Sequence, residues 1–395
     1  MILAHKIALD PNDGQATYFT RACGTARFAY NWALSEWRRQ YKEGGKPSEA
    51  ALRRRLNEVK REQFPWMLEV TKVAPQQAIK NLGVAFKRFF AGQGKYPQFK
   101  KKSVHDSFRA DNGPGTFEVK DRRIKLPVIG WVRLREPLRF AGRLVSATVS
   151  RVADRWFVSV QVEIEPKASV SENQGKAVGV DLGVKALATM SDGSVFKGPK
   201  ALRHCLTKLK RLSRSLSRKV RGSGNRRKAK AMLARLHARI SNIRKDALHK
   251  LTTDIARRFQ VIGIEDLNVR GMMANEALAR SIADMGFHEF RRQLDYKAKM
   301  HGGIVIVAPR FYPSSKTCSA CGHIAPTLPL SVREWTCPAC GGVHNRDRNA
   351  AVNLERLAVS STVTACGEES SGGELAHVVK LASVKQESSA EPIYA

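Results

Sequence analysis

Four cysteines toward the C-terminus have the type and spacing of metal ligands. They form two CxxC pairs separated by fifteen residues, namely Cys318 and Cys321, then Cys337 and Cys340. This number and spacing of thiols is typical of structural zinc sites, and four thiolates leave no open coordination position for a substrate. We therefore predict a structural zinc ion, with a redox dithiol as the alternative. His323 and His344 lie nearby but are surplus, so we expect both to be ordinary polar residues.

Three acidic residues stand at the ends of apolar segments that are far apart in the sequence. Asp181 ends AVGVD, Glu265 ends VIGIE, and Asp347 begins the helix expected from NRDRNAAVN. Acids that converge at one edge of a sheet repel one another unless cations neutralise them, and two Mg²⁺ ions about 3.5–4 Å apart serve in-line phosphodiester hydrolysis. Each acid also has a simpler interpretation. Asp181 could stabilise a turn, Glu265 could be a surface acid, and Asp347 could cap its helix.

The strand-end acids require a sheet, and the surrounding pattern predicts one. Apolar runs bounded by turn residues indicate buried strands, and i+3 and i+4 spacing indicates helices. The expected elements are a strand pair within 177–193, a helical hairpin over 201–258 broken at 221–225, a strand at 259–267, a helix over 278–300, a strand at 302–308 and a last helix over 348–359.

The helical hairpin carries a one-sided charge. Residues 201–250 include seventeen Lys or Arg and one acid, Asp246, while leucines form an opposing apolar stripe. A solvated helix face is the alternative interpretation. So large an excess of positive charge favours contact with a nucleic-acid backbone.

The N-terminal part of the chain changes from helical to strand periodicity. The expected elements are a strand at 2–9, three helices around residues 19–37, 52–59 and 75–89, and two β-hairpins over 116–134 and 145–164. Alternating apolar and polar residues support the hairpins. Together with the first strand, they suggest a small β-barrel that holds the helices as an insertion.

The overall charge indicates a polyanionic partner. Lys and Arg number 69 against 35 Asp and Glu, which gives a formal net charge of +34 and a pI near 10.3. Nucleic acid is the leading candidate, because neutralising its phosphates drives binding. A membrane surface is the alternative, but no apolar run approaches the roughly 18 residues of a spanning helix. The N-terminus has no signal-peptide pattern, so we expect a cytoplasmic protein.

Several local motifs resemble those of one known family. They are FYPSSKTCSACG (311–322), WTCPACG (335–341), RDRNAAVNL (346–354), GVDLGVKALA (179–188), IGIEDL (262–267) and LARSIADMGFHEFRRQLDYKA (278–298). In combination these motifs are highly specific, and the match runs from about residue 2 to about residue 357. On these residues the chain resembles TnpB, the accessory protein of insertion-sequence transposons and a relative of the type V CRISPR effectors.

The resemblance implies an RNA-guided DNA endonuclease that cleaves guide-matched DNA beside a short flanking motif. Its expected partners are a guide RNA and target double-stranded DNA; we also expect a monomer, associated with the nucleoid of a prokaryotic cell. The family's triad corresponds to Asp181, Glu265 and Asp347, which would hold two catalytic Mg²⁺ ions beside the structural Zn²⁺. Two features depart from the family pattern. Asn345 stands where many relatives have an acid, and Asp266 adjoins Glu265 as a competing ligand.

The resemblance also implies an α/β multidomain fold with an RNase H-like RuvC core. The expected domains are a β-barrel (wedge) domain at 1–10 and 104–170, a helical recognition domain at 11–103, a RuvC-like nuclease domain at 175–310 and 342–359, a zinc-ribbon insertion that binds target nucleic acid at 311–341, and a disordered tail at 360–395. The tail is expected because the composition there changes to Ser, Glu and Gly.

Three other functions use similar features. A nuclease-inactive guided repressor would be expected to lose triad carboxylates, and this chain keeps all three. A DNA-joining transposase on the same core fold would act without RNA. A simple zinc-ribbon RNA-binding protein would need no Mg²⁺ and would tolerate loss of the acids.

Overall fold

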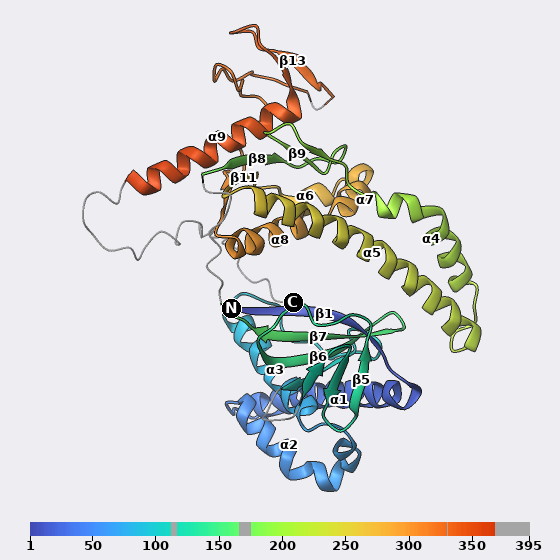
Figure 1. Cartoon of the computed structure of the whole chain (residues 1–395). Helices are drawn as coiled ribbons and strands as arrows, with labels where there is room; N and C mark the ends of the chain where they lie inside the picture. Colours follow the sequence, from blue (N-terminus) through green and yellow to red (C-terminus); the bar gives the residue numbers. More distant parts are fainter. Residues whose placement is uncertain (112–116, 166–174, 330, 368–395) are drawn as a thin grey trace, which may run out of the picture. The chain divides into compact units, whose positions relative to one another are not determined.

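The computed structural model describes residues 1–111, 117–165, 175–329 and 331–367 of the 395. The chain forms two compact units (Figure 1). Unit 1 comprises Met1–Ala168 and Cys205–Ile240, and unit 2 comprises Ser169–His204 and Ser241–Ala395. No helix in the described part of the chain has the length and apolar character needed to cross a membrane.

Unit 1 contains a seven-stranded antiparallel sheet. Its strands are β1 (Ile2–Asp10), β2 (Ser107–Asp111), β3 (Glu118–Lys120), β4 (Arg123–Leu126), β5 (Gly130–Leu134), β6 (Arg143–Val152) and β7 (Arg155–Glu163), in the order β2-β6-β7-β1-β5-β4-β3. The predicted β6–β7 hairpin is present. The hairpin predicted over 116–134 is instead three short strands, which lie within residues 118–134. The described strands make an open order, so the predicted closed barrel is not confirmed.

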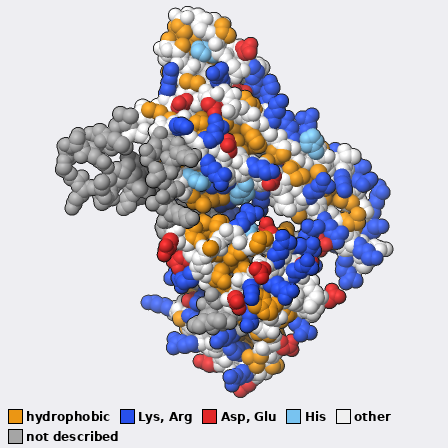
Figure 2. Space-filling view, in the orientation of Figure 1, with side chains coloured by type: hydrophobic (Ala, Val, Ile, Leu, Met, Phe, Trp, Pro, Cys, Tyr) orange, Lys and Arg blue, Asp and Glu red, His pale blue; other side chains and the backbone are white. Residues whose placement is uncertain are grey.

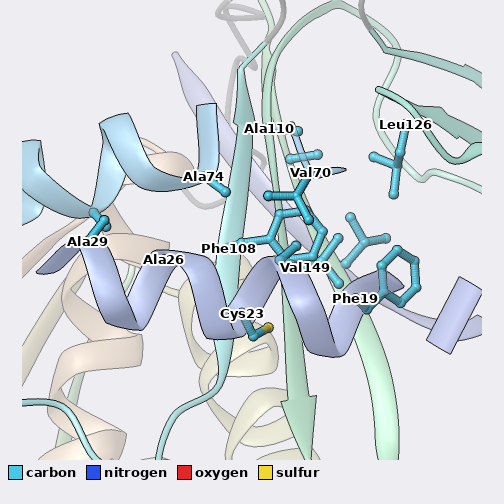
Figure 3. Packing of buried hydrophobic residues seen from close by; sticks show 14 of the residues in the cluster. Phe19, Cys23, Ala26, Ala29, Val70, Ala74, Phe108, Ala110, Leu126 and Val149 are labelled. Atoms are coloured by element: carbon cyan, nitrogen blue, oxygen red, sulfur yellow. The ribbon is translucent and has the colours of Figure 1, made fainter. Parts of the chain in front are cut away.

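The helices of unit 1 pack on this sheet. They are α1 (Asp13–Lys42), α2 (Glu49–Gln63), the 3₁₀ helix η1 (Pro65–Glu69) and α3 (Val73–Phe90). Asn12 begins α1 through a capping box with Gln15, which satisfies backbone N–H groups of the first turn. Phe19 and Cys23 on α1 lie in one apolar core with Phe108 of the sheet (Figure 3). Burial raises the pKa of the Cys23 thiol to about 12, so this cysteine is unreactive at neutral pH.

Unit 2 is built on a five-stranded sheet. Its strands are β8 (Ala177–Asp181), β9 (Ala188–Met190), β10 (Val195–Phe196), β11 (Val261–Glu265) and β12 (Ile304–Ala308), in the order β10-β9-β8-β11-β12. Strands β8, β11 and β12 are parallel, and β9 turns back antiparallel to β8. Asp181 and Glu265 are therefore the last residues of neighbouring parallel strands, so both lie at the same edge of the sheet.

Helices cover both faces of this second sheet. They are the C-terminal part of α5 (Gly224–Arg258), α6 (Val269–Met273), α7 (Glu276–Met285), α8 (Phe287–Met300) and α9 (Arg346–Gly367). Most of α4 (Ala201–Ser217) and the first part of α5 belong to unit 1. The C-terminal part of α5 packs with α8 on one face, and α9 lies on the other (Figure 1).

Two helix boundaries differ from the expected ones. The single helix predicted over 278–300 is broken at Gly286, whose φ of 72° belongs to the left-handed region, so α7 ends there and α8 begins. Helix α9 continues to Gly367 and so includes the first residues of the expected tail. The rest of that tail, 368–395, lies outside the described residues.

Two adjacent glycines allow α9 to lie directly on the sheet. Gly179 of β8 and Gly263 of β11 are register partners. A Cβ atom on Gly179 would lie 1.8 Å from the carbonyl oxygen of Ala351, and one on Gly263 would lie 2.2 Å from that of Leu354. Both obstacles are helix backbone, which cannot move aside as a flexible side chain could. The position of α9, and therefore that of Asp347, depends on the absence of side chains at Gly179 and Gly263.

Gly179→Ala and Gly263→Ala are each expected to lower the free energy of unfolding by about 3 kcal/mol or more, because the added methyl group must push α9 off the sheet. Urea titration followed by circular dichroism measures the loss. Gly193→Ala is the matched control. Its φ of 87° strains the backbone, but nothing lies within 4 Å of the new Cβ atom, so a loss of only about 1–2 kcal/mol is expected. Equal losses in all three variants would contradict the close-approach explanation.

Candidate active site

The edge of the sheet in unit 2 opens into a cavity of about 340 Å³. Polar side chains from three strands, one helix and three loops line it, namely Asp181, Lys185, Thr189, Glu265, Ser315, Arg333, Arg346 and Asp347. The structure thus places all three acids singled out in the sequence around one cavity. Helix α9 supplies Asp347 from its first turn, and β8 and β11 supply the other two from their last residues.

The cavity disfavours the ionised form of Asp181. Burial raises the pKa of Asp181 well above its ordinary value, and the charges of Glu265 and Asp347 raise it further. Arg346 and Arg333 act in the opposite direction but do not offset the rise. An additional cation would stabilise the ionised form of Asp181. The donor set, three carboxylates in one concave site, suits a hard divalent cation such as Mg²⁺.

Protein donors hold two of the three acids. The hydroxyl group of Ser314 donates a hydrogen bond to Glu265, and the guanidinium of Arg333 lies 3.1 Å from Asp347. The three carboxylates do not form a close metal-binding cluster of the kind that the described cysteines form. Repulsion between like charges, together with these two competing donors, explains why the acids surround the cavity without meeting at its centre.

Asp266, the competing acid, has other partners. Its carboxylate pairs with the guanidinium groups of Arg291 and Arg310, each at 2.9 Å. It is not among the residues that line the cavity. Because strand residues alternate in direction, Glu265 and Asp266 point apart, and the structure favours Glu265 as the residue that faces the cavity.

The other departure from the family pattern also has a structural explanation. The side-chain oxygen of Asn345 accepts a hydrogen bond from the backbone N–H of Arg348 at 3.2 Å. Asn345 is therefore the N-cap of α9, and it satisfies a backbone donor that the first helical turn leaves free. The side chain acts on the helix that carries Asp347, two residues further on.

The four predicted zinc ligands come together. The ligand atoms of the cluster Cys318, Cys321, Cys337 and Cys340 all lie within 4.8 Å of one another. Each CxxC turn closes through a hydrogen bond to the carbonyl of its first cysteine, donated by Gly322 in one and Gly341 in the other, both at 2.9 Å. A short hairpin of β13 (Glu334–Thr336) and β14 (Val343–Asn345) joins this cluster to α9. The cluster is compatible with a structural metal ion.

The environment of Cys318 favours its thiolate. Burial opposes ionisation, but backbone N–H groups of Cys321 and Ala320 point at the sulfur and outweigh that effect, which lowers the pKa of the Cys318 thiol to about 7. The thiolate is the form that binds metal. The Cys340 thiol shifts in the opposite direction: a backbone hydrogen bond from Gly342 lowers its pKa, but the neighbouring thiols of Cys321 and Cys318 raise it to about 12. The ligand assignment therefore rests on the clustering of the four sulfurs.

His344 is not the ordinary polar residue that we expected. Its Nε2 lies 3.0 Å from the sulfur of Cys318, and its ring packs against Trp335 with centroids 5.2 Å apart. The imidazole is therefore within hydrogen-bond distance of a predicted zinc ligand. The sequence contained one indication of this contact, because His344 stands only four residues after Cys340. His323, in contrast, is exposed, and Cys318 uses only its backbone carbonyl.

The basic hairpin forms as expected from α4 and α5, and it presents its charge outward. Figure 2 shows Lys and Arg side chains gathered over these two helices. Arg226 closes the turn between them, because its guanidinium donates to the carbonyls of Leu216 and Lys219 at 3.0 and 2.7 Å. Apolar residues such as Leu212 and Leu236 are buried. The result is a charged face of the kind that contacts phosphate backbones.

Three family models match parts of the chain. The OrfB_IS605 model, described as "Probable transposase", matches residues 159–276, and the Cas12f1-like TNB domain model matches residues 287–354. A model described as a helix-turn-helix domain matches residues 1–46, where the structure has strand β1 followed by the single helix α1.

Full-length relatives are similar throughout. A protein of Streptomyces pristinaespiralis named "Putative RNA-guided DNA endonuclease" is 40% identical over 378 residues, which covers 92% of this chain and 91% of the relative. The protein InsQ of Escherichia coli K12, with the same description, is 36% identical over 382 residues and covers 92% and 94%. The chain belongs to the TnpB family, which includes the OrfB proteins of IS605-type transposons.

A solved structure shows the same fold at lower identity. The Cas12f1 chain of a Cas12f1–sgRNA–target DNA complex matches with a TM-score of 0.58 at 17% identity, over 87% of this chain and 83% of that chain. At this identity the match concerns the fold alone. Family membership and the overall fold are therefore established independently of the cavity, and together they make this chain a TnpB protein with a Cas12f1-like fold.

Proposed function

We propose that the chain is an RNA-guided DNA endonuclease of an insertion-sequence transposon, which cleaves guide-matched DNA beside a short flanking motif. One observation carries the proposal. The three acids line a single cavity at one sheet edge, in a chain that is 40% identical over 378 residues to a relative named "Putative RNA-guided DNA endonuclease". The partners would be a guide RNA and target double-stranded DNA, bound in a prokaryotic cytoplasm at the nucleoid.

Asp181, Glu265 and Asp347 would hold the catalytic ions in this proposal. Two Mg²⁺ ions bound by them would activate the attacking water and stabilise charge on the leaving 3′ oxygen. Because Asp181 interacts electrostatically with both other acids, cations held in this cavity would neutralise charge on all three. Arg333 and Arg346 line the same cavity and would orient the phosphate backbone of the DNA.

The remaining assignments follow from this function. Residues 175–310 and 342–359, which lie in unit 2 except for 205–240, would form the RNase H-like RuvC core. The four clustered cysteines would hold a structural Zn²⁺ in the zinc ribbon at 311–341. In unit 1, residues 1–10 with 104–170 and residues 11–103 would bind guide RNA and target duplex. The basic face of the α4–α5 hairpin would follow the backbone of the heteroduplex, which such proteins recognise by shape and not by sequence.

Purification with co-purifying RNA tests the function. Sequencing is expected to find one abundant RNA species, and the complex is expected to cut DNA that matches its guide segment when Mg²⁺ is present. The products should carry 5′-phosphate and 3′-hydroxyl ends, as hydrolysis at the 3′ oxygen requires. RNase treatment before loading should abolish cleavage, and mismatched DNA should stay intact.

One other function has a specific observation in its favour, because a matching family model is described as a probable transposase. A DNA-joining transposase would act on transposon ends without RNA. Activity that survives RNase treatment, or joined instead of cleaved DNA, would replace the proposed function with this one.

A further inference from the structure

One short segment touches both the carboxylate cavity and the cysteine cluster. Residues 314–319 run from the carboxylate cavity to the cysteine cluster. At one end the hydroxyl of Ser314 donates to Glu265, and at the other Cys318 is one of the four clustered thiols. Ser314 is 3% exposed, so its hydroxyl has little access to solvent. The segment is a physical link between Glu265 and the cysteine cluster.

Side chains of helix α9 form hydrogen bonds with the backbone of this segment. Asn349, Asn353 and Arg356 follow one another at intervals of four and three residues, so they share one face of the helix. Asn353 donates to the carbonyls of Ser314 and Thr317 at 2.8 and 2.7 Å.

The side chains of Asn349 and Arg356 hold the rest of the segment. Asn349 donates to the carbonyl of Thr317 at 2.7 Å and accepts from the backbone N–H of Ser319 at 2.9 Å, and Arg356 donates to the carbonyl of Ser319. The same helix carries Asp347. Two of the three acids are therefore tied to one hydrogen-bonded assembly.

These contacts are too well enclosed to be incidental. Asn349 and Asn353 are 2% and 3% exposed. A buried side-chain amide without hydrogen-bond partners lowers the stability of the fold. Here the amides of Asn349 and Asn353 both form hydrogen bonds with the backbone of segment 314–319. Asn353 bonds directly to the carbonyl of Ser314, and Asn349 holds the residues that follow it, Thr317 and Ser319. The arrangement specifies where the Ser314 hydroxyl lies.

We propose that Ser314 is a positioning residue for the catalytic metal site: it fixes the orientation of Glu265, and Asn353 fixes Ser314. The inference rests on the proposed function, since it assumes that Glu265 binds a cation. A carboxylate with one oxygen held by a hydroxyl directs its remaining oxygen and lone pairs toward the cavity. Without that bond Glu265 could turn to several rotamers, and each cation would have to order it on binding. Partners of this kind typically change metal affinity by about 10–100-fold.

Metal affinity, measured apart from cleavage, tests the proposal. Mn²⁺ binding to the full chain with its RNA is followed by electron paramagnetic resonance, which counts free and bound ions. Ser314→Ala is expected to weaken Mn²⁺ binding roughly 10-fold or more, and Ser314→Thr, which keeps the hydroxyl, to recover most of it. Asn353→Asp is expected to weaken binding too, since it turns a donor toward two carbonyls into an acceptor.

Ser319→Ala is the matched control, because Ser319 meets α9 through its backbone N–H and carbonyl. It should bind Mn²⁺ as the unchanged chain does. Zinc content and thermal unfolding are measured on every variant, and Ser314→Ala should leave both unchanged.

The possible outcomes distinguish the positioning role of Ser314 from the proposed function of the chain. Unchanged Mn²⁺ affinity in Ser314→Ala, or a threonine variant as weak as the alanine variant, overturns the positioning role of Ser314. Unchanged affinity in Asn353→Asp overturns the role of Asn353. An unchanged chain that binds no Mn²⁺, or binds it equally after Asp181→Asn, overturns the proposed function itself.

Discussion

Asp181→Asn and Glu265→Gln are each expected to slow RNA-guided DNA cleavage by on the order of 10³-fold or more, whereas Asp266→Asn should cleave at a rate close to that of the unchanged chain. All three substitutions remove one negative charge and keep the side-chain size. They differ in where the charge lies. Asp181 and Glu265 line the cavity, while Asp266 pairs with Arg291 and Arg310 outside it.

The size of the expected loss follows from what the acids would do. An amide is a poor ligand for Mg²⁺ compared with a carboxylate, so each substitution would weaken or misplace an ion whose task is to stabilise charge in the transition state. Binding of guide RNA and of matched DNA uses other surfaces and should be unchanged. Loss of Asp266 would leave two partly exposed arginines without that partner, which costs little.

Single-turnover cleavage of labelled DNA measures the rates, and gel-shift titration of the same complexes measures DNA binding. Comparing Glu265→Gln with Asp266→Asn is informative because the two residues are adjacent. A general effect of altering this end of the strand would slow cleavage in both variants. Full activity in Glu265→Gln with loss in Asp266→Asn would mean that the acids had been assigned in the wrong order. Loss of DNA binding in Asp181→Asn would mean that the acid supports the fold and not the chemistry.

Local patterns in the sequence were sufficient to predict the strands and the helix that carry the three acids. The apolar runs ending at Asp181 and Glu265 are strands β8 and β11, and the segment after Asn345 is a helix. Period and composition act over a few residues, so a single sequence displays them. That the acids belong together came from the family motifs, because pairing of β8 with β11 joins residues more than eighty positions apart.

Contacts made across long separations were missed for the same reason. Ser314 meets Glu265, and Asn353 meets Ser314, through side-chain geometry that no periodicity encodes. The break at Gly286 was overlooked because an apolar pattern continues on both sides of it, and only the left-handed φ reveals the change of direction. The N-terminal barrel was inferred from strand alternation, which predicts strands and one buried face but does not decide whether a sheet closes.

Removing zinc is expected to unfold the cysteine-containing insertion while the rest of the chain stays folded. This part of the protein has almost no core of its own: its buried cluster consists of Cys318, Ala325, Trp335 and Cys337, of which two are expected metal ligands. Strands β13 and β14 have three residues each, too few for an independently stable hairpin. Structural zinc contributes about 10–16 kcal/mol of apparent binding free energy to small domains of this kind.

Cys337→Ser should therefore lower the bound zinc from about one ion per chain to none and open the insertion to trypsin at Lys316 and Arg333. Colorimetric zinc release and mass spectrometry of the tryptic fragments measure the two effects. Cys205→Ser, which changes a half-buried cysteine outside the cluster, is the matched control and should keep both the zinc and the protection.

The same substitution should also weaken Mn²⁺ binding at the carboxylate cavity, because segment 314–319 loses its anchor at Cys318 and is then held by α9 alone, which leaves Ser314 less firmly placed against Glu265. Arg333 would be released from Asp347 at the same time, since it lies in the insertion just before β13. Loss of that ion pair alone would strengthen cation binding by removing a competing positive charge. The two effects thus have opposite signs, and Arg333→Ala in the zinc-bound chain isolates the second. If Cys337→Ser binds Mn²⁺ more tightly than the unchanged chain, competition by Arg333 outweighs the support that the segment gives to Glu265.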